Sequence, residues 1–231
     1  MADMQGEEWK KLKRMVTPPF SVPRLKKTVP AMNIAAEKLT NYLKSKENAE
    51  FVNAVDFTKK FYMTTVASVL YGIDIDCFGA EQSEFEKKGK GLLLVPKFII
   101  KDLFPSLAIL FKIKFIDPDS EKFFSNLCRR IVNERKNLNM EVKDVLGNLI
   151  NVAKENPALT EEMMYKTCVQ FFTDGYETAS LSISVLIYYL ARNQEIQEKV
   201  QEEIDEMFEN KGEKTQVEEK DLNGMPYLDQ V

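Results

Sequence analysis

Apolar side chains recur every three or four residues along most of this chain, which is the spacing of one face of an α-helix. The longest such stretch starts after Thr160, a predicted N-cap followed by two acids, and continues to about Arg192. A helix of this length would measure about 50 Å, which is enough to cross a domain. Between Leu181 and Leu190 it is apolar on nearly every side, so other elements have to cover it. The pattern therefore predicts a mainly α fold arranged around a central helix at residues 160–192.

Shorter helical patterns flank the central helix on both sides. No strand-rich block and no run of about 18 apolar residues interrupts them, so residues 1–231 are expected to contain little or no β-sheet and no membrane span. The expected helices run from Trp9 to just before Pro18, from Arg24 to Lys46, from an Asp56 N-cap to Tyr71, from Asp117 to about Asn137, from Asp144 to Asn156, from Asn193 to Asn210 and from Met225 onward.

Composition narrows the possible functions. A net charge of −4 argues against a nucleic-acid binder, and 44% hydrophobic residues suffice for a core. The absence of histidine removes the commonest metal ligand and the commonest general base. Cys77, Cys128 and Cys168 stand singly, which suits a reducing compartment, and the latter two are expected in the core. The acids at 202–206 fit a solvated helix face, so no metal site is predicted.

Residues 87–114 differ from the rest of the chain because they are both basic and apolar. Seven lysines stand against one acid, Asp102, and Pro96 and Pro105 divide the apolar residues into short pieces. Such pieces with lysine rims suit an element that lies on an anionic membrane surface, and an ordinary pair of surface helices fits equally well. The lysines are Lys87, Lys88, Lys90, Lys97, Lys101, Lys112 and Lys114.

The centre of the long helix contains residues that a helix interior normally avoids. Gly175 costs about 1 kcal/mol relative to alanine, and a carboxylate such as that of Asp174 is expensive to bury without a partner. Gly175 would let a flat ligand approach the backbone, and Glu177 beside Thr178 supplies an acid and an alcohol for a short proton relay. The alternative is a packing notch in which Thr178 bonds the Asp174 carbonyl. The residues alone leave these two interpretations equal.

A second candidate site lies near the start of the chain. Trp9 and Lys13 are four residues apart and share a helix face. They fit a solvated helix with a cation–π contact, and they also fit a cationic pocket for a ligand carboxylate or phosphate.

The stretch Asp-Gly-Tyr-Glu-Thr-Ala at 174–179 closely resembles the distal-helix motif of the cytochrome P450 family, (Ala/Gly)-Gly-x-(Asp/Glu)-Thr-(Thr/Ser). The likeness extends over nearly the whole chain and looks closest to animal microsomal members. It implies a partial cytochrome P450 fold with helices C to J around a long central I helix. In family order, 6–21 resembles the C helix and its continuation, 57–74 the E helix, 159–162 the entry to the I helix, 188–193 with 202–204 the I-to-J passage, and 226–231 the start of the K helix.

The resemblance implies a haem-thiolate monooxygenase that inserts one atom of O₂ into a lipophilic small molecule. Electrons would come from NADPH through a cytochrome reductase. The location implied is the cytosolic face of the endoplasmic reticulum membrane, with mitochondria as the less favoured alternative. Residues 87–114 would be the F–G region, which dips into the membrane near the substrate channel.

Site roles follow from the same resemblance, residue by residue. Thr178 would hold and protonate the bound dioxygen, Glu177 would assist proton delivery, and Gly175 would lie over the haem face. Trp9 and Lys13 would hold a haem propionate. The family usually has arginine at the position of Lys13, which meets a carboxylate only as a point charge.

The sequence departs from the family pattern in two further ways that affect the expected function. Asp174 stands where the family has alanine or glycine, which places a possible negative charge beside the oxygen site. The chain starts just before the C helix and stops before the Glu-x-x-Arg of the K helix, and no cysteine lies in a Phe-x-x-Gly-x-Arg-x-Cys-x-Gly context. We therefore expect an incomplete domain that is inactive alone, with an open apolar face at Phe171, Phe172, Gly175 and Ala179.

Two other classes of protein fit a helical chain. A non-catalytic all-α binding or interaction protein, derived from the same fold, would need none of the site residues. An acidic-helix metal enzyme of the terpene-cyclase type is disfavoured, because the chain lacks an Asp-Asp-x-x-Asp motif.

Overall fold

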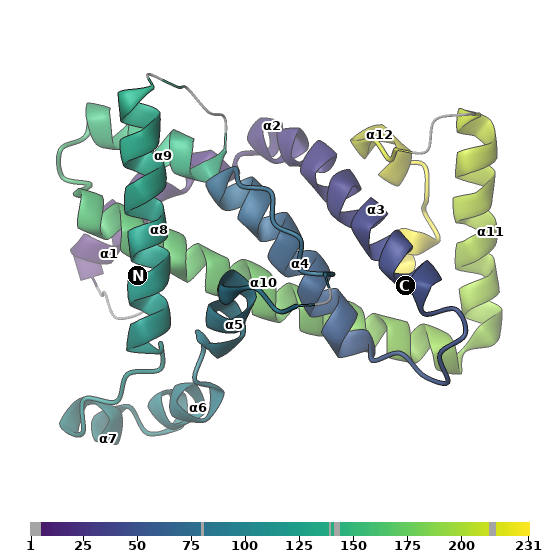
Figure 1. The fold of residues 1–231 in the computed structure, drawn as a ribbon, viewed down its shortest axis with the longest axis horizontal. Helices are drawn as coiled ribbons and strands as arrows, with labels where there is room; N and C mark the ends of the chain where they lie inside the picture. Colours follow the sequence, from purple (N-terminus) through teal and green to yellow (C-terminus); the bar gives the residue numbers. More distant parts are fainter. Residues whose placement is uncertain (1–5, 80, 139, 141–143, 213–215) are drawn as a thin grey trace.

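A long helix forms the axis of the molecule (Figure 1). The computed structural model describes residues 6–79, 81–138, 140, 144–212 and 216–231. Helix α10, Glu161–Arg192, crosses the whole fold. The Thr160 side chain accepts a hydrogen bond from the backbone N–H of Met163, and two acids lie in the first turn, so the predicted start of the helix is confirmed.

Helix α4, Ala54–Tyr71, lies across α10 and makes its most extensive contact. The predicted Asp56 cap is wrong: the Asn53 side chain accepts from the backbone N–H groups of Val55 and Asp56. The helix ends, as predicted, at Gly72, which has a φ of 65°. A side chain there would also collide with the Asp144 carboxylate, so glycine is required twice over.

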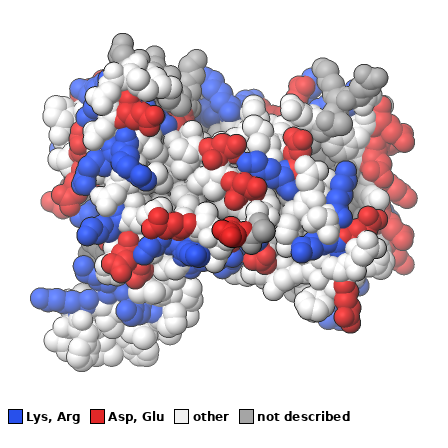
Figure 2. Space-filling model, viewed as in Figure 1, with Lys and Arg blue, Asp and Glu red and all other residues white. Residues whose placement is uncertain are grey.

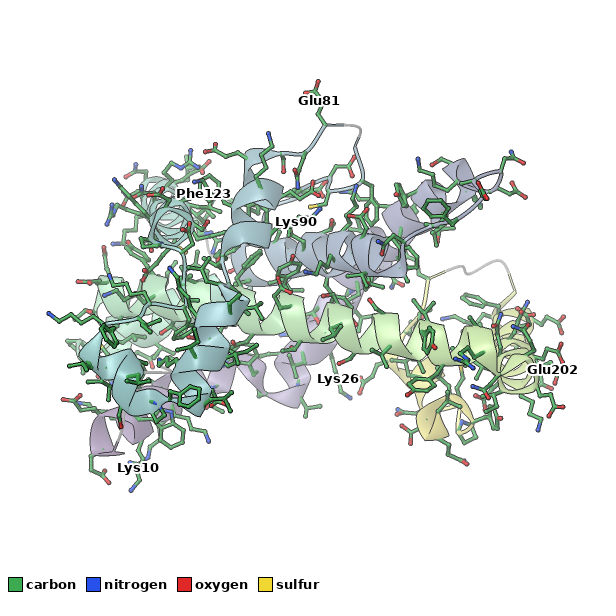
Figure 3. All side chains as sticks on the ribbon, turned by 90° about the horizontal axis from the view of Figure 1, so that it is seen from below. Lys10, Lys26, Glu81, Lys90, Phe123 and Glu202 are labelled. Atoms are coloured by element: carbon green, nitrogen blue, oxygen red, sulfur yellow. The ribbon has the colours of Figure 1, made fainter. Side chains whose placement is uncertain are left out.

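The other helices cover the two ends of this pair. Helices α8 and α9 pack at one end of α10 and α11 at the other, and α3 packs on α4. Figure 3 places Lys10 of α1 and Glu202 of α11 at these opposite ends. The bounds are α1 Gly6–Val16, α2 Val22–Leu25, α3 Val29–Ser45, α5 Glu84–Gly91, α6 Val95–Leu103, α7 Pro105–Leu110, α8 Pro118–Asn137, α9 Val145–Glu155, α11 Gln194–Lys211 and α12 Glu219–Leu222, with 3₁₀ turns at Pro18–Phe20, Lys26–Thr28 and Leu228–Gln230.

Two predicted helices differ from the structure. The expected helix from Arg24 to Lys46 is divided into α2, a 3₁₀ turn and α3, and Pro30 lies in the first turn of α3, where a proline fits best. The segment from Met225 forms only a 3₁₀ turn. Its backbone N–H groups at Tyr227 and Leu228 donate to the Glu203 carboxylate at 2.9 and 2.8 Å.

The core lies where α4, α5, α8 and α10 meet. Phe172 is 0% exposed, and its ring is 4.5 Å from that of Phe124 and 5.4 Å from that of Phe85. The prediction that Phe172 faces an open side is therefore wrong, because α5 closes over it. Cys128 and Cys168 are buried, as predicted.

The fold class is confirmed as mainly α. Within the described ranges there is no strand, and an isolated bridge between Leu93 and Ile116 is the only β contact. No helix in the described part of the chain combines the length and the apolar character that crossing a membrane requires.

Candidate functional site

One side of α10 is left uncovered over most of its carboxy-terminal two thirds. Its exposed residues recur at intervals of three or four, which makes them one continuous face. Leu181 and Val185 are 58% and 45% exposed, so much of this face is apolar. We call it the open stripe, and it consists of Asp174, Thr178, Leu181, Val185, Tyr188 and Arg192.

Thr178 lies on the open stripe with its hydroxyl bonded to its own helix. Its Oγ1 donates to the Asp174 carbonyl oxygen at 2.6 Å, which is the bond of the packing-notch interpretation. The Asp174 carboxylate accepts from Gln170 Nε2 at 2.8 Å. Desolvation raises the pKa of Asp174, and the bond from Gln170 opposes this effect. The carboxyl is therefore easier to protonate than an ordinary aspartate.

Glu177 does not join Thr178 on the open stripe. Its carboxylate lies 3.1 Å from Lys59 Nζ of α4, and both side chains are mostly buried. The structure thus places the predicted acid and alcohol on different sides of α10. Lys59 was missed by the sequence reasoning, because no pattern in the chain pairs it with Glu177.

Gly175 borders the open stripe and is half-buried. A Cβ added there would lie 3.5 Å from Val66 Cγ2, which is an ordinary contact. Packing within the described chain therefore accommodates alanine at a position where glycine lowers helix stability by about 1 kcal/mol. Packing against Val66 therefore gives no reason for a glycine at this position.

Trp9 and Lys13 lie together on α1, with Lys13 Nζ 4.8 Å from the centre of the indole. Lys13 also lines a shallow groove of about 400 Å³, and Phe20 is another of its lining residues. The ring of Phe20 meets that of Phe171 edge-on at 4.7 Å, and Phe171 lies two turns before Thr178 on the same side of α10. The groove and the open stripe are thus neighbours. The groove is lined by Lys13, Arg14, Thr17, Pro18, Phe20 and Ser21.

The basic and apolar segment forms a separate lobe below α10 (Figure 1). Figure 2 shows this lobe as mostly uncharged, with lysines and arginines above and beside it. Ile109 and Leu110 are 78% and 71% exposed. We call the uncovered set the apolar lobe: Val95, Phe98, Ile99, Ile100, Leu103, Phe104, Leu107, Ile109, Leu110 and Phe111.

The side chains of the open stripe and the groove fit a flat apolar ligand that carries carboxylates at one edge. The open stripe offers aliphatic contact, Gly175 allows close approach, and Lys13 and Arg14 offer positive charge in the adjoining groove. Among the described residues, no group of three or more His, Cys, Asp or Glu side chains could hold a metal ion. The three cysteines are buried, and burial raises the pKa of Cys77 to about 11. None of them offers a thiolate to the open stripe.

Comparison with known proteins gives a consistent result. The cytochrome P450 family model matches residues 1–231. Cytochrome P450 3A12 of Canis lupus familiaris is 33% identical over 98% of this chain, and cytochrome P450 3A25 of Mus musculus is 30% identical over 98%. A probable cytochrome P450 6a13 of Drosophila melanogaster is 25% identical over 99%. The aligned part is 47% of each relative, so the chain spans about half their length. The match of the family model over the full length shows that the chain belongs to the cytochrome P450 family.

Proposed function

We propose that the protein is a haem-thiolate monooxygenase of lipophilic small molecules and that this chain supplies one wall of its haem site. The observation that carries the proposal is the open stripe of α10 meeting the cationic groove of α1 through Phe20 and Phe171. Together they match a macrocycle with an apolar face and an anionic edge. A bound haem would supply the chemistry that activates dioxygen, and Lys13 and the open stripe of α10 would hold it on this side.

Each residue of the site then has a physical task. Lys13 binds a carboxylate at the edge of the haem, and Arg14 in the same groove adds a second positive charge. Leu181 and Val185 present aliphatic surface that excludes water from the stripe. Gly175 keeps the helix backbone accessible.

Thr178 is the proton-handling group of this wall. Its hydroxyl proton is engaged with the Asp174 carbonyl, so the oxygen lone pairs remain to accept a bond on the exposed side. Passing a proton onward requires the hydroxyl to rotate, which a single-bond rotation permits. Glu177 assists only after it leaves Lys59, so the ion pair controls when the acid is available.

The whole protein is required for the test of this function. We expect the reduced protein with haem and carbon monoxide to give the thiolate-type absorption band, and NADPH with a cytochrome reductase to support turnover of an apolar substrate. Thr178→Ala should then uncouple oxygen consumption from product formation, whereas Asp174→Ala reports whether that acid is needed. Absence of both the band and turnover would favour a non-catalytic helical interaction protein.

We further propose that the apolar lobe rests on the cytosolic face of the endoplasmic reticulum membrane. Its exposed aliphatic and aromatic side chains would enter the headgroup region, while Lys97, Lys112 and Lys114 meet anionic lipids. Contiguous apolar surface of this kind on a folded domain marks an interaction site.

Vesicle binding distinguishes this surface from an ordinary pair of helices. Leu110→Ser with Phe111→Ser should reduce co-sedimentation with vesicles containing phosphatidylserine by about tenfold, because two exposed apolar anchors are lost. Leu138→Ser is the control, because this leucine is 61% exposed and lies at the end of α8, outside the apolar lobe, so its loss should leave binding unchanged. Equal binding by both variants would contradict the proposal.

A further inference from the structure

Asp174 carries the only negative charge on the open stripe. Arg192 stands at the other end, where its guanidinium donates to the Tyr188 hydroxyl at 2.8 Å and lies over the ring of the same tyrosine. The four positions between Asp174 and Arg192 are uncharged, and two of them, Leu181 and Val185, are exposed aliphatic residues. The stripe is therefore a largely apolar surface with a single carboxylate at one end.

The four acidic residues of α10 differ in their partners. Three of them form ion pairs with lysines. The pairs are Glu161 with Lys136, Glu162 with Lys166 and Glu177 with Lys59, at 2.6, 2.7 and 3.1 Å. Asp174 accepts instead from the neutral amide of Gln170 at 2.8 Å. Among the residues that the structure describes, no lysine or arginine side chain forms an ion pair with it.

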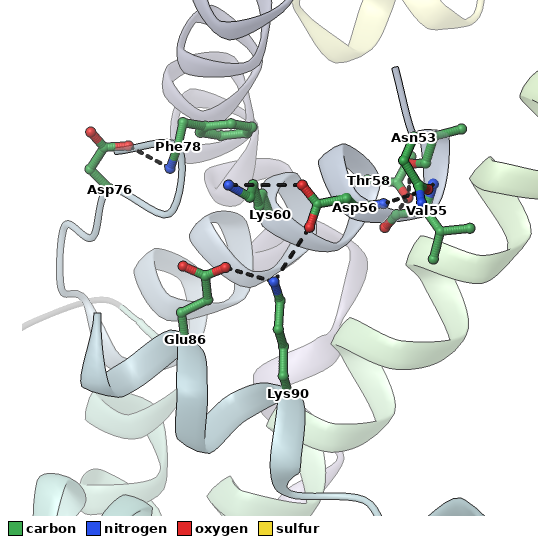
Figure 4. A network of polar contacts seen from close by, with 10 residues as sticks. Asn53, Val55, Asp56, Thr58, Lys60, Asp76, Phe78, Glu86 and Lys90 are labelled. Atoms are coloured by element: carbon green, nitrogen blue, oxygen red, sulfur yellow. Dashed lines mark hydrogen bonds and ion pairs between the residues drawn. The ribbon is translucent and has the colours of Figure 1, made fainter. Parts of the chain in front are cut away.

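Acids on the neighbouring helices are also met by a lysine (Figure 4). Lys90 of α5 lies 2.8 Å from Glu86 and 3.4 Å from Asp56 of α4. Glu86 is 3% exposed, so this chain supplies a positive charge where that carboxylate leaves water. Asp174 departs from this pattern, although desolvation raises its pKa. A partly desolvated carboxylate without a counter-ion is stabilised when a cation binds to it.

The residues that follow Asp174 define the shape of a ligand that would use its charge. Leu181 and Val185 lie on the same face, about 10 and 16 Å further along the helix axis. A ligand with a cationic head and an apolar body of that length contacts both parts of the stripe at once. Thr178 lies one turn from Asp174, and its hydroxyl bonds the Asp174 carbonyl. The cation would thus lie beside the hydroxyl that handles protons in the proposed function.

We propose that Asp174 is a specificity-determining residue that makes lipophilic amines the preferred substrates of this site. The protonated amine binds the Asp174 carboxylate, and its apolar body lies along Leu181 and Val185. A neutral lipophilic molecule gains only the second contact. The inference rests on the proposed function, because an amine bound at Asp174 becomes a substrate only where α10 forms the wall of a haem site. The distal-helix motif has alanine or glycine at this position, so the preference belongs to this chain and not to the motif.

Two probes of the same shape separate charge from apolar contact. Trimethyl(phenylpropyl)ammonium is permanently cationic, and its quaternary nitrogen has no lone pair with which to bind iron. Its neutral isostere has a tert-butyl group in place of the trimethylammonium group. Equilibrium dialysis against the haem-loaded whole protein gives the dissociation constant of each probe. Asp174→Asn should weaken binding of the ammonium probe about tenfold, the effect of one charge-assisted contact, and leave binding of the isostere unchanged.

Two further variants serve as controls for the loss of charge. Asp174→Glu keeps the negative charge and should retain most of the affinity for the ammonium probe. Glu162→Gln removes an acid of the same helix that is already paired with Lys166, and it should leave both affinities unchanged. An Asp174→Asn protein that binds both probes as the parent does, or that loses affinity for both equally, would overturn the proposal.

Absorbance of the same samples reports bound haem and separates this proposal from the proposed function. Retained haem together with unchanged binding of the ammonium probe by Asp174→Asn would overturn the amine preference alone. A parent protein that retains no haem would overturn the proposed function, and the amine preference with it.

Discussion

The Glu177 carboxylate lies 3.1 Å from the ammonium group of Lys59, so the acid beside Thr178 faces α4 and not the open stripe. Thr178 itself faces outward and bonds the Asp174 carbonyl. The two residues of the predicted relay are neighbours in sequence but point to different sides of α10. If Glu177 and Thr178 act together in proton transfer, the ion pair between Glu177 and Lys59 has to open first.

The ion pair is expected to stabilise the fold. Lys59→Met removes the partner of a mostly buried carboxylate and should lower the free energy of unfolding by about 1–3 kcal/mol at pH 7. Lys166→Met is the control, because its pair with Glu162 lies within one helix and is exposed, which makes it worth less than about 0.5 kcal/mol. Urea unfolding compares the two, and equal losses would mean that burial of the Lys59 pair has no energetic weight.

Two glycines should respond to alanine in opposite directions. Gly175→Ala should stabilise α10 by up to about 1 kcal/mol, since the new methyl group makes only an ordinary contact with Val66. Gly72→Ala should cost at least about 2 kcal/mol, because the residue has a positive φ and its side chain would displace Asp144. Thermal unfolding of each variant measures its stability relative to the parent. A destabilised Gly175→Ala protein would show that packing within this chain requires the glycine.

Asp117 should make α8 sensitive to acid. Its side chain accepts from the Ser120 backbone N–H at 2.8 Å, and this bond lowers the pKa of the carboxyl. A lowered folded pKa gives stability that is present above the unfolded value and lost as the pH falls through the folded value. Asp117→Ala should therefore cost about 1 kcal/mol at pH 7 and almost nothing near pH 2, whereas Asp119→Ala in the same turn should cost less than about 0.5 kcal/mol.

Asp174 should have the opposite dependence on pH. Desolvation raises its pKa, so the ionised form is disfavoured in the folded state, and stability is lost as the pH rises through the folded value. Asp174→Asn should unfold at a higher temperature than the parent at pH 7, and the difference should close as the pH is lowered below about 4. A variant less stable than the parent at pH 7 would show that the bond from Gln170 outweighs the desolvation of the carboxylate.

Elements whose signals are local could be predicted from the sequence. The start of α10 follows from the Thr160 cap and its acidic first turn, and the end of α4 follows from Gly72. The N-cap of α4 was misplaced because Asn53 and Asp56 are both good caps, and the choice depends on backbone geometry. The break between α2 and α3 shows Pro30 acting in its preferred first-turn position within an otherwise continuous amphipathic pattern.

Contacts between distant segments could not be predicted in the same way. The burial of Phe172 depends on α5, which approaches closely because Gly89 has no side chain. The meeting of Phe20 with Phe171, and of Lys59 with Glu177, joins residues far apart in the chain that share no periodic signal. The motif at 174–179 predicted where the candidate site lies, and tertiary packing determined which of its side chains face outward.

The central claim is that α1 and α10 bind the anionic edge and the face of a haem, and Trp9 reports on it directly. It is the only tryptophan in the chain, and it lies 4.8 Å from Lys13 Nζ. Haemin titrated into the purified protein should quench its fluorescence saturably with one site per chain. Lys13→Met should weaken binding by about tenfold, the effect of one charge-assisted contact. Lys10→Met, whose lysine pairs with Glu7, should leave it unchanged. Unsaturable quenching, or equal effects of the two variants, would contradict the claim.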